Sequence, residues 1–182
     1  VCSDYVESQK VLRAMQALTN NKVVYVPSRD DVLLYKANAS KNVVYQRNHA
    51  LHSILSGTAV GAVVCIDALM QFLPLQQKFT NDCFTLQKGV CYDTSMVVSQ
   101  LVACGYTRTD GISAEGEFVM RGDILDIMLP FGQHFRVDFW DDEVERISQV
   151  GEDNLSVQQV DSFDVFPLYD TTGLDAANLA KV

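Results

Sequence analysis

The stretch "GEFVMRGDILDIMLPFGQHFRVDFWDDEVERI", residues 116–147, decides the fold of the second half of this chain. Its apolar residues recur at every second position, as in Phe118, Met120, Phe135, Val137 and Phe139. Such alternation is typical of antiparallel strands that bury one face and leave the other in water. "PFGQ" at 130–133 and "DD" at 141–142 contain residues that commonly connect the strands of hairpins. The stretch therefore predicts an antiparallel sheet.

A helix is expected to cover the apolar face of this sheet. The apolar spacing of residues 94–104 fits one side of a helix, with Asp93 placed to cap its N-terminus and Gly105 to follow its C-terminus. A helix packed on one face of an antiparallel sheet makes a small α+β domain. We assign residues 84–148 to this domain.

The chain on both sides of this region has a different pattern. "KVVYV" at 22–26 and "AVVCI" at 62–66 are continuous apolar runs, and helical patterns lie before and between them. Such strands alternating with helices are typical of a parallel α/β layer, and a strand-like pattern returns in "FDVFPL" at 163–168. We therefore predict a discontinuous α/β domain, made of residues 1–83 and 149–182, into which the α+β domain is inserted.

Composition limits the class of protein. The chain has 182 residues and a formal net charge of -9, and its lysines and arginines are scattered. Because phosphate contacts require clustered basic side chains, this charge disfavours a nucleic-acid-binding domain. No G-x-x-x-x-G-K-[ST] motif occurs, so we expect no ATP held by that phosphate loop, and no apolar run reaches membrane-spanning length. The chain lacks an initiator methionine and ends in a helix-like pattern, so we expect a piece of a larger protein.

Metal chemistry has little support in the sequence. The five cysteines form no C-x-x-C pair, so we expect structural thiols in a reducing cytoplasm rather than a zinc site. His49 and His52 are three residues apart, but no third ligand is near them in the sequence. An alternative hypothesis is a metal-dependent enzyme that uses "DDE" at 141–143 with Glu145, although no His or Lys stands beside these acids. We expect no catalytic residue, no cofactor and no metal in this chain.

Within residues 116–147, acidic and basic side chains alternate with apolar ones. Arg121, Asp123, Asp126, Arg136 and Asp138 lie along strands that could have been far more apolar. Cross-strand ion pairs in water are one explanation, and each exposed pair of this kind contributes only about 0–1 kcal/mol. A docking surface for a partner is the other, because Arg and acidic side chains give directional, complementary contacts. The residues alone leave both explanations open.

"LVACGYTRTDGISAEGEFVMRGDILDIMLP" at 101–130, with "FRVDFWDDEVERI" at 135–147, resembles a module shared by bacterial transcription-repair coupling factors and the excision-nuclease protein UvrB. The family pattern is G-Y-x-R, then G-x-F-x-V-R-G-[GD]-I-[LI]-[DE]-[IV], then R-[IV]-E-F-F-x-D-E-[IV]-x-x-I. The match is dense over residues 86–150 and looser over 47–74. The coupling factor is favoured, because UvrB is expected to have a phosphate loop and a long aromatic hairpin, and this chain has neither. A fragment of UvrB that serves damage verification is the alternative.

The resemblance implies a fold and a function. The α/β domain would be a RecA-like remnant similar to UvrB but without nucleotide binding, and the inserted domain would dock the damage-recognition protein UvrA. The chain would recruit UvrA for nucleotide excision repair at a lesion where RNA polymerase has stalled. The full-length parent is expected to be a cytoplasmic, ATP-dependent DNA translocase. Its other partners would be RNA polymerase and double-stranded DNA, and a separate motor module would bind ATP and Mg²⁺. This fragment would not be an enzyme.

The resemblance also implies which residues dock UvrA. The family uses the Arg of G-Y-x-R, the Arg of V-R-G and the acid of R-[IV]-E-F, which correspond to Arg108, Arg121 and Asp138. Arg136 is adjacent to this acid and joins the set. Asp138 is one methylene shorter than the Glu of the pattern, and Trp140 is an additional candidate.

Overall fold

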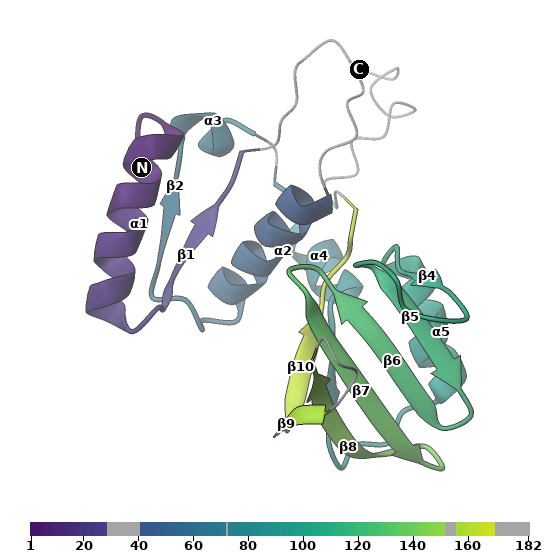
Figure 1. Cartoon of the computed structure of the whole chain (residues 1–182). Helices are drawn as coiled ribbons and strands as arrows, with labels where there is room; N and C mark the ends of the chain where they lie inside the picture. Colours follow the sequence, from purple (N-terminus) through teal and green to yellow (C-terminus); the bar gives the residue numbers. More distant parts are fainter. Residues whose placement is uncertain (29–40, 72, 152–155, 170–182) are drawn as a thin grey trace, which may run out of the picture. The chain divides into compact units, whose positions relative to one another are not determined.

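The computed structural model describes residues 1–28, 41–71, 73–151 and 156–169, and it mixes helices with largely antiparallel sheets (Figure 1). The described chain forms two compact units, the first within Val1–Thr80 and the second within Asn81–Tyr169. The elements of the first unit are α1 (Tyr5–Thr19), β1 (Val23–Val26), α2 (Lys41–Leu55), β2 (Gly61–Val64) and α3 (Ile66–Leu69). Helix α4 (Gln76–Asp82) leads along the chain into the second unit.

The first unit is built on two parallel strands. All four residues of β1 pair with β2, as the two continuous apolar runs predicted. Helices α1 and α2 both pack against these strands (Figure 1). Asp4 begins α1, because its carboxylate accepts the Glu7 N–H at 2.8 Å. The buried cluster of this unit consists of Cys2, Leu12, Val23, Tyr25, Val63 and Cys65.

The second unit is dominated by a six-stranded sheet in the order β4-β5-β6-β7-β8-β9, and β10 and β3 form a separate antiparallel pair. All neighbours in the large sheet are antiparallel except β4 and β5, which are parallel. The elements are β3 (Phe84–Gln87), α5 (Thr94–Ala103), β4 (Thr107–Arg108), β5 (Glu117–Arg121), β6 (Ile124–Leu129), β7 (Gln133–Trp140), β8 (Glu143–Val150), β9 (Ser156–Val160) and β10 (Ser162–Val165).

One face of the large sheet forms the core of the second unit, as the alternation predicted. The completely buried side chains on this face are Phe118, Leu125, Ile127, Val137, Val144 and Ile147. Helix α5 lies behind the sheet in Figure 1 and buries Val97 and Leu101. Asp93 caps the helix as predicted, since its carboxylate accepts the backbone N–H groups of Ser95 and Met96. The pKa of Asp93 is lowered by these contacts, first by the bond from the Ser95 hydroxyl.

Both predicted hairpin connections are present. Phe131 and Gly132 have φ values of 64° and 69° between β6 and β7, and Asp141 has a φ of 57° between β7 and β8. Positive φ at these positions is typical of tight hairpin turns, because such turns match the right-handed twist of the strands. The two turns fix which residues of β6, β7 and β8 lie opposite one another.

The second unit does not end at residue 148, where we expected the insert to end. Strand β8 continues to Val150, β9 pairs with β8, and β10 pairs with β3 instead of returning to the parallel layer. Phe163 of β10 stacks on Phe135 of β7 with ring centroids 4.4 Å apart, so β10 is part of this core. Residues 170–182 of the predicted α/β domain lie outside the described residues.

This arrangement predicts different behaviour for two fragments of the chain. A fragment of residues 81–169 should unfold in one cooperative transition, because it retains β3, β9 and β10. A fragment of residues 84–148 should be loosely packed, because it loses the stacking partner of Phe135 and the strand that covers Leu86. Near-ultraviolet circular dichroism during thermal unfolding compares them. Equal cooperativity and stability of the two fragments would contradict the assignment of β9 and β10 to this core.

Candidate functional site

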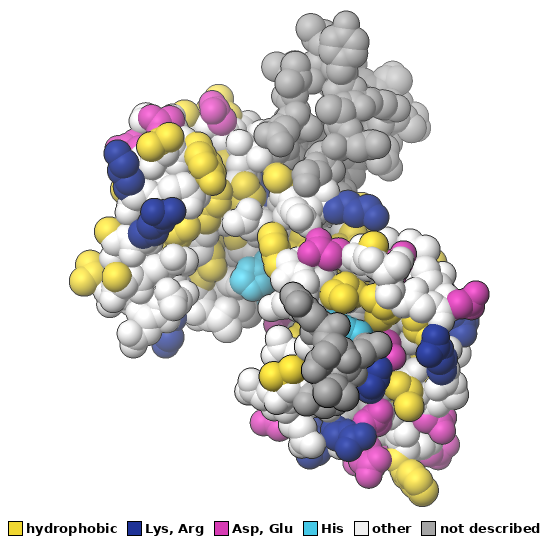
Figure 2. Space-filling view, in the orientation of Figure 1, with side chains coloured by type: hydrophobic (Ala, Val, Ile, Leu, Met, Phe, Trp, Pro, Cys, Tyr) yellow, Lys and Arg dark blue, Asp and Glu magenta, His cyan; other side chains and the backbone are white. Residues whose placement is uncertain are grey.

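The outer side of the large sheet has a row of ionised side chains, which we call the charged face: Arg121, Asp126, Arg136, Asp138 and Arg146. They alternate along β5–β8 with the buried residues of the core, so they project from the opposite side of the sheet. Figure 2 shows basic and acidic side chains interspersed over this part of the second unit. The charged face is therefore mixed in sign and does not form a single basic or acidic patch.

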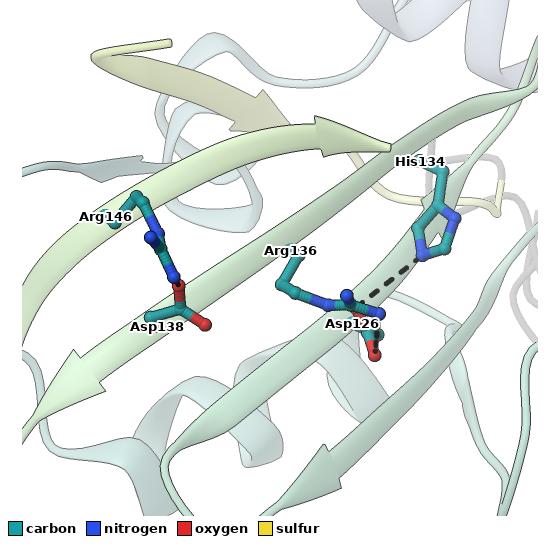
Figure 3. Close-up of polar contacts among 5 residues, drawn as sticks. All are labelled: Asp126, His134, Arg136, Asp138 and Arg146. Carbon is teal, nitrogen blue, oxygen red and sulfur yellow. Dashed lines mark hydrogen bonds and ion pairs between the residues drawn. The ribbon is translucent and has the colours of Figure 1, made fainter. Parts of the chain in front are cut away.

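The first ion pair of the charged face joins β6 to β7. Asp126 lies opposite Arg136 in the strand register, and Arg136 donates from Nε to Oδ1 at 2.7 Å and from Nη2 to Oδ2 at 3.2 Å (Figure 3). The side chain of Arg136 is only 29% exposed and that of Asp126 only 17%. The hydrogen bond that Arg136 donates to Asp126 is the main reason that the pKa of Arg136 is raised, while desolvation acts in the opposite direction. This two-point contact fixes both groups in one geometry.

The second ion pair joins β7 to β8. Arg146 donates from Nε to Oδ2 of Asp138 at 2.7 Å (Figure 3). A β-bulge between Asp138 and Phe139 shifts the register, so that Arg146 lies opposite Asp138. The Arg146 side chain is 55% exposed, whereas that of Asp138 is 15% exposed. Of the residues that the resemblance implied, Arg136 and Asp138 are thus already bound to neighbours within the sheet.

Arg121 has a different environment at the end of β5. Arg121 is exposed, and its Nη2 donates to the backbone carbonyl oxygen of Asp110 in the loop between β4 and β5. The following Gly122 has a φ of 57° and open space around its Cα, so no side chain crowds the guanidinium from that position. Within the described residues, no carboxylate forms an ion pair with Arg121. This arginine is therefore held in place while most of its N–H groups face solvent.

Arg108 and Trp140 lie apart from the centre of the charged face. Arg108 pairs with Phe118 in the register of β4 and β5, which places it on the edge strand and on the side of the core-facing residues. It is exposed there, and the structure does not bring it beside Arg121. Trp140 is exposed at the end of β7, two residues after Asp138 on the same side. Its indole thus extends the charged face toward the β7–β8 turn.

A pocket of about 350 Å³ opens on the charged face. It is lined by the loop between β4 and β5, by Gly151, and by Val119, Arg121, Asp126, Met128, His134 and Arg136. The side chain of His134 is 9% exposed, and its Nε2 has no hydrogen-bond partner in the described part of the chain. Oδ1 of Asp126 lies 3.7 Å from this nitrogen, which is too distant for a hydrogen bond (Figure 3).

The pKa of His134 is lowered, first because burial disfavours the imidazolium and also because Arg136 is nearby, while Asp126 opposes the shift. His134 is therefore neutral at pH 7. His134 and Arg146 were not selected from the sequence, and Asp126 was noted there only as one of the alternating charges. Of the three, only Asp126 could have been found from the sequence, as the acid opposite Arg136 across the predicted β6–β7 hairpin.

The alternative metal-dependent enzyme lacks a suitable site in the described residues. They contain no group of three His, Cys, Asp or Glu side chains that could hold a metal ion, whether around residues 141–145 or around His49 and His52. The five cysteines are free thiols. Burial raises the pKa of Cys83 to about 12 and that of Cys104 to about 11, which makes both poor nucleophiles. In the same residues, no helix combines the length and apolar character needed to cross a membrane.

Comparison with known proteins defines the class of the second unit. Residues 84–170 match the sequence model of the UvrB interaction domain. This stretch runs from β3 through β10 and includes the whole charged face. The second unit is therefore similar to the UvrB interaction domain.

Relatives of known name match most of the chain. It is 28% identical over 164 residues to the transcription-repair-coupling factor of Bacillus subtilis, an alignment that covers 88% of this chain and 14% of that protein. It is 28% identical over 145 residues to the UvrABC system protein B of Methanococcus maripaludis, covering 79% of this chain and 22% of that protein. The chain thus spans between a seventh and a quarter of these relatives. The resemblance to coupling factors and to UvrB is confirmed.

The two ion pairs should differ in strength because they differ in exposure. A double-mutant cycle with Asp126→Ala and Arg136→Ala should give a coupling free energy of about 1–2 kcal/mol, as expected for a charge-assisted pair away from water. The matched cycle with Asp138→Ala and Arg146→Ala should give less than about 1 kcal/mol, because Arg146 is solvated. Urea unfolding at equilibrium measures both. A stronger coupling for the second pair would contradict this account of the charged face.

Proposed function

We propose that this chain is the part of a transcription-repair coupling factor that docks UvrA, and that the charged face is its docking surface. The observation that carries the proposal is the position of Arg121, Arg136 and Asp138 on one face of the matched domain, away from the core. Packing of the core does not require ionised side chains on this face. An interface of opposite charges gives a partner both orientation and a faster encounter.

Arg121 is the anchor of the proposed interface. Its guanidinium is oriented by the Asp110 carbonyl oxygen, and no carboxylate of the described residues neutralises it. A partner carboxylate can therefore use its planar set of donors without displacing a neighbour. Because the side chain is already held in place, less conformational entropy is lost on binding.

Arg136 and Asp138 have a different part in the proposed interface. Each is already paired, Arg136 with Asp126 and Asp138 with Arg146, so a partner that broke either pair would leave a charge without its neighbour. We infer that both pairs stay intact and present a fixed pattern of charge to UvrA. Trp140 lies on the same side and would contribute apolar contact area at the margin. Arg108 would contribute only from the edge of the sheet.

The wider assignment follows from the relatives. The match to the Bacillus coupling factor covers more of this chain than the match to the Methanococcus UvrB, 88% against 79%, which favours the coupling factor over a UvrB fragment. On this proposal, the first unit is a RecA-like remnant without nucleotide, and the second unit is inserted into it. The parent would be a cytoplasmic DNA translocase whose separate motor module binds ATP and Mg²⁺. RNA polymerase and double-stranded DNA would be partners of that parent, while this fragment would act in repair only by binding.

Arg121→Ala should weaken binding of UvrA from the same organism by about 2 kcal/mol or more, roughly thirtyfold. The change removes an exposed side chain with one bond to a carbonyl oxygen, so the free energy of unfolding should fall by no more than about 1 kcal/mol. Isothermal titration calorimetry measures the first effect and urea unfolding the second.

Arg13→Ala is the matched control, because it removes an exposed arginine from α1 in the other unit. It should bind UvrA with wild-type affinity. Two results would contradict the proposal: an Arg121→Ala chain that stays folded and binds normally, or a control that loses as much affinity as Arg121→Ala does.

A further inference from the structure

The pocket on the charged face has more hydrogen-bond donors than acceptors. Asp126 is the one carboxylate among the described residues that line the pocket, and each of its oxygens already accepts a bond from Arg136. Arg136 uses Nε and Nη2 in that pair and retains Nη1, while Arg121 uses only Nη2. The buried Nε2 of His134 has no partner among the described residues. An occupant of this pocket should therefore be an acceptor.

The charge and walls of the pocket narrow the class of occupant further. Among the described residues, two guanidinium groups and one carboxylate line the pocket, so the charges of these groups sum to a positive value, within a chain whose formal net charge is -9. Val119 and Met128 add apolar walls that suit the methylene groups of a side chain. The volume of 350 Å³ lies at the lower end of the range of ligand pockets, about 300–1000 Å³. An aspartate or glutamate side chain fits these properties, whereas a lysine or arginine does not.

We propose that this pocket receives a carboxylate side chain of the docked partner, with His134 Nε2, Arg121 and Arg136 as its donors. The inference rests on the proposed function, since it names the group of UvrA that the charged face would bind. His134 is a new member of this interface, contributed from β7 to the lining that it shares with Arg121 and Arg136. A buried imidazole nitrogen left without a partner costs stability, and a bound carboxylate would remove that cost.

Binding should then be coupled to protonation of His134. Among the described residues, the charged groups around it are Asp126 on β6, Arg136 on β7 and Arg121 on β5, whereas its register partner Val150 on β8 and the adjoining Gly151 carry no charge. In the free chain, burial and Arg136 hold the pKa of His134 below its usual value near 6.5, so the imidazole is neutral at pH 7. A bound carboxylate favours the imidazolium and raises this pKa. Affinity should therefore increase as the pH falls from about 8 to about 6, by at most tenfold per pH unit.

The first experiment uses sodium acetate as the carboxylate probe and does not require UvrA. The pKa values of the three histidines are measured by nuclear magnetic resonance in acetate and in sodium chloride of equal ionic strength. Acetate should raise the pKa of His134 and leave those of His49 and His52 unchanged. The variants His49→Gln and His52→Gln assign the signals by elimination, so the assignment does not depend on a variant at the buried position. An unchanged pKa of His134 in acetate would overturn the proposal.

The second experiment measures UvrA affinity at about pH 8 and about pH 6. The wild-type chain and the His49→Gln control should both bind more tightly at the lower pH. Their gain in affinity between the two pH values should exceed that of His134→Gln by about threefold or more. If His134→Gln does not fold, His134→Asn replaces it with a smaller neutral amide. The same pH dependence in the wild type and in the folded His134 variant would overturn the use of this pocket in docking. UvrA binding that is absent altogether, together with a positive acetate result, would instead contradict the proposed function while supporting the pocket.

Discussion

Leu125, Val137 and Ile147 lie side by side across β6, β7 and β8, and each is completely buried. Burying them commits their neighbours along the same strands to the opposite face, because successive side chains of a strand point to opposite sides. A slip of the register by one residue would turn every ionised group of the charged face into the core, at a cost of several kcal/mol for each unpaired charge. The position of the charged face is therefore a consequence of the core behind it.

Within the charged face, the ion pairs serve geometry more than stability. The Asp126–Arg136 and Asp138–Arg146 pairs each span two strands, so they hold four side chains in fixed positions. An exposed pair such as Asp138–Arg146 contributes only about 0–1 kcal/mol, so stability is a weak reason for retaining so many charges on a sheet. Their arrangement leaves the donors of Arg121, the Nη1 group of Arg136 and the pocket above His134 available to a partner. On our proposal, these donors would receive an acidic group of the partner.

The large sheet could be predicted from the sequence because the patterns that indicate it are local. Alternation identified the buried face, the two hairpin connections followed from their residue types, and Asp93 was recognised as a helix cap. What the sequence could not show depends on contacts between distant residues. Strand β10 pairs with β3 from the start of the unit, so the expected boundary at residue 149 was misplaced. The parallel pairing of β4 with β5 puts Arg108 on the side away from Arg121, which no local pattern records.

The partner of Asp138 was hidden for a related reason. The turn at 141–142 sets Trp140 opposite Glu143, and an unbroken ladder would place Glu145 opposite Asp138. The bulge adds one residue to β8 and brings Arg146 there instead, which exchanges a repulsive contact for an ion pair. His134 was missed because its importance rests on a pocket formed by three strands and a loop.

The most direct test of the central claim, that the charged face docks UvrA, is site-specific photo-crosslinking. Ile124 lies on this face between Arg121 and Asp138 in the register and is exposed, so it can be replaced by p-benzoylphenylalanine without disturbing the core. Val102 is exposed on α5, which covers the other side of the sheet, and serves as the matched position. This account predicts that UvrA is captured from position 124 and not from position 102. Capture from position 102 alone would contradict it.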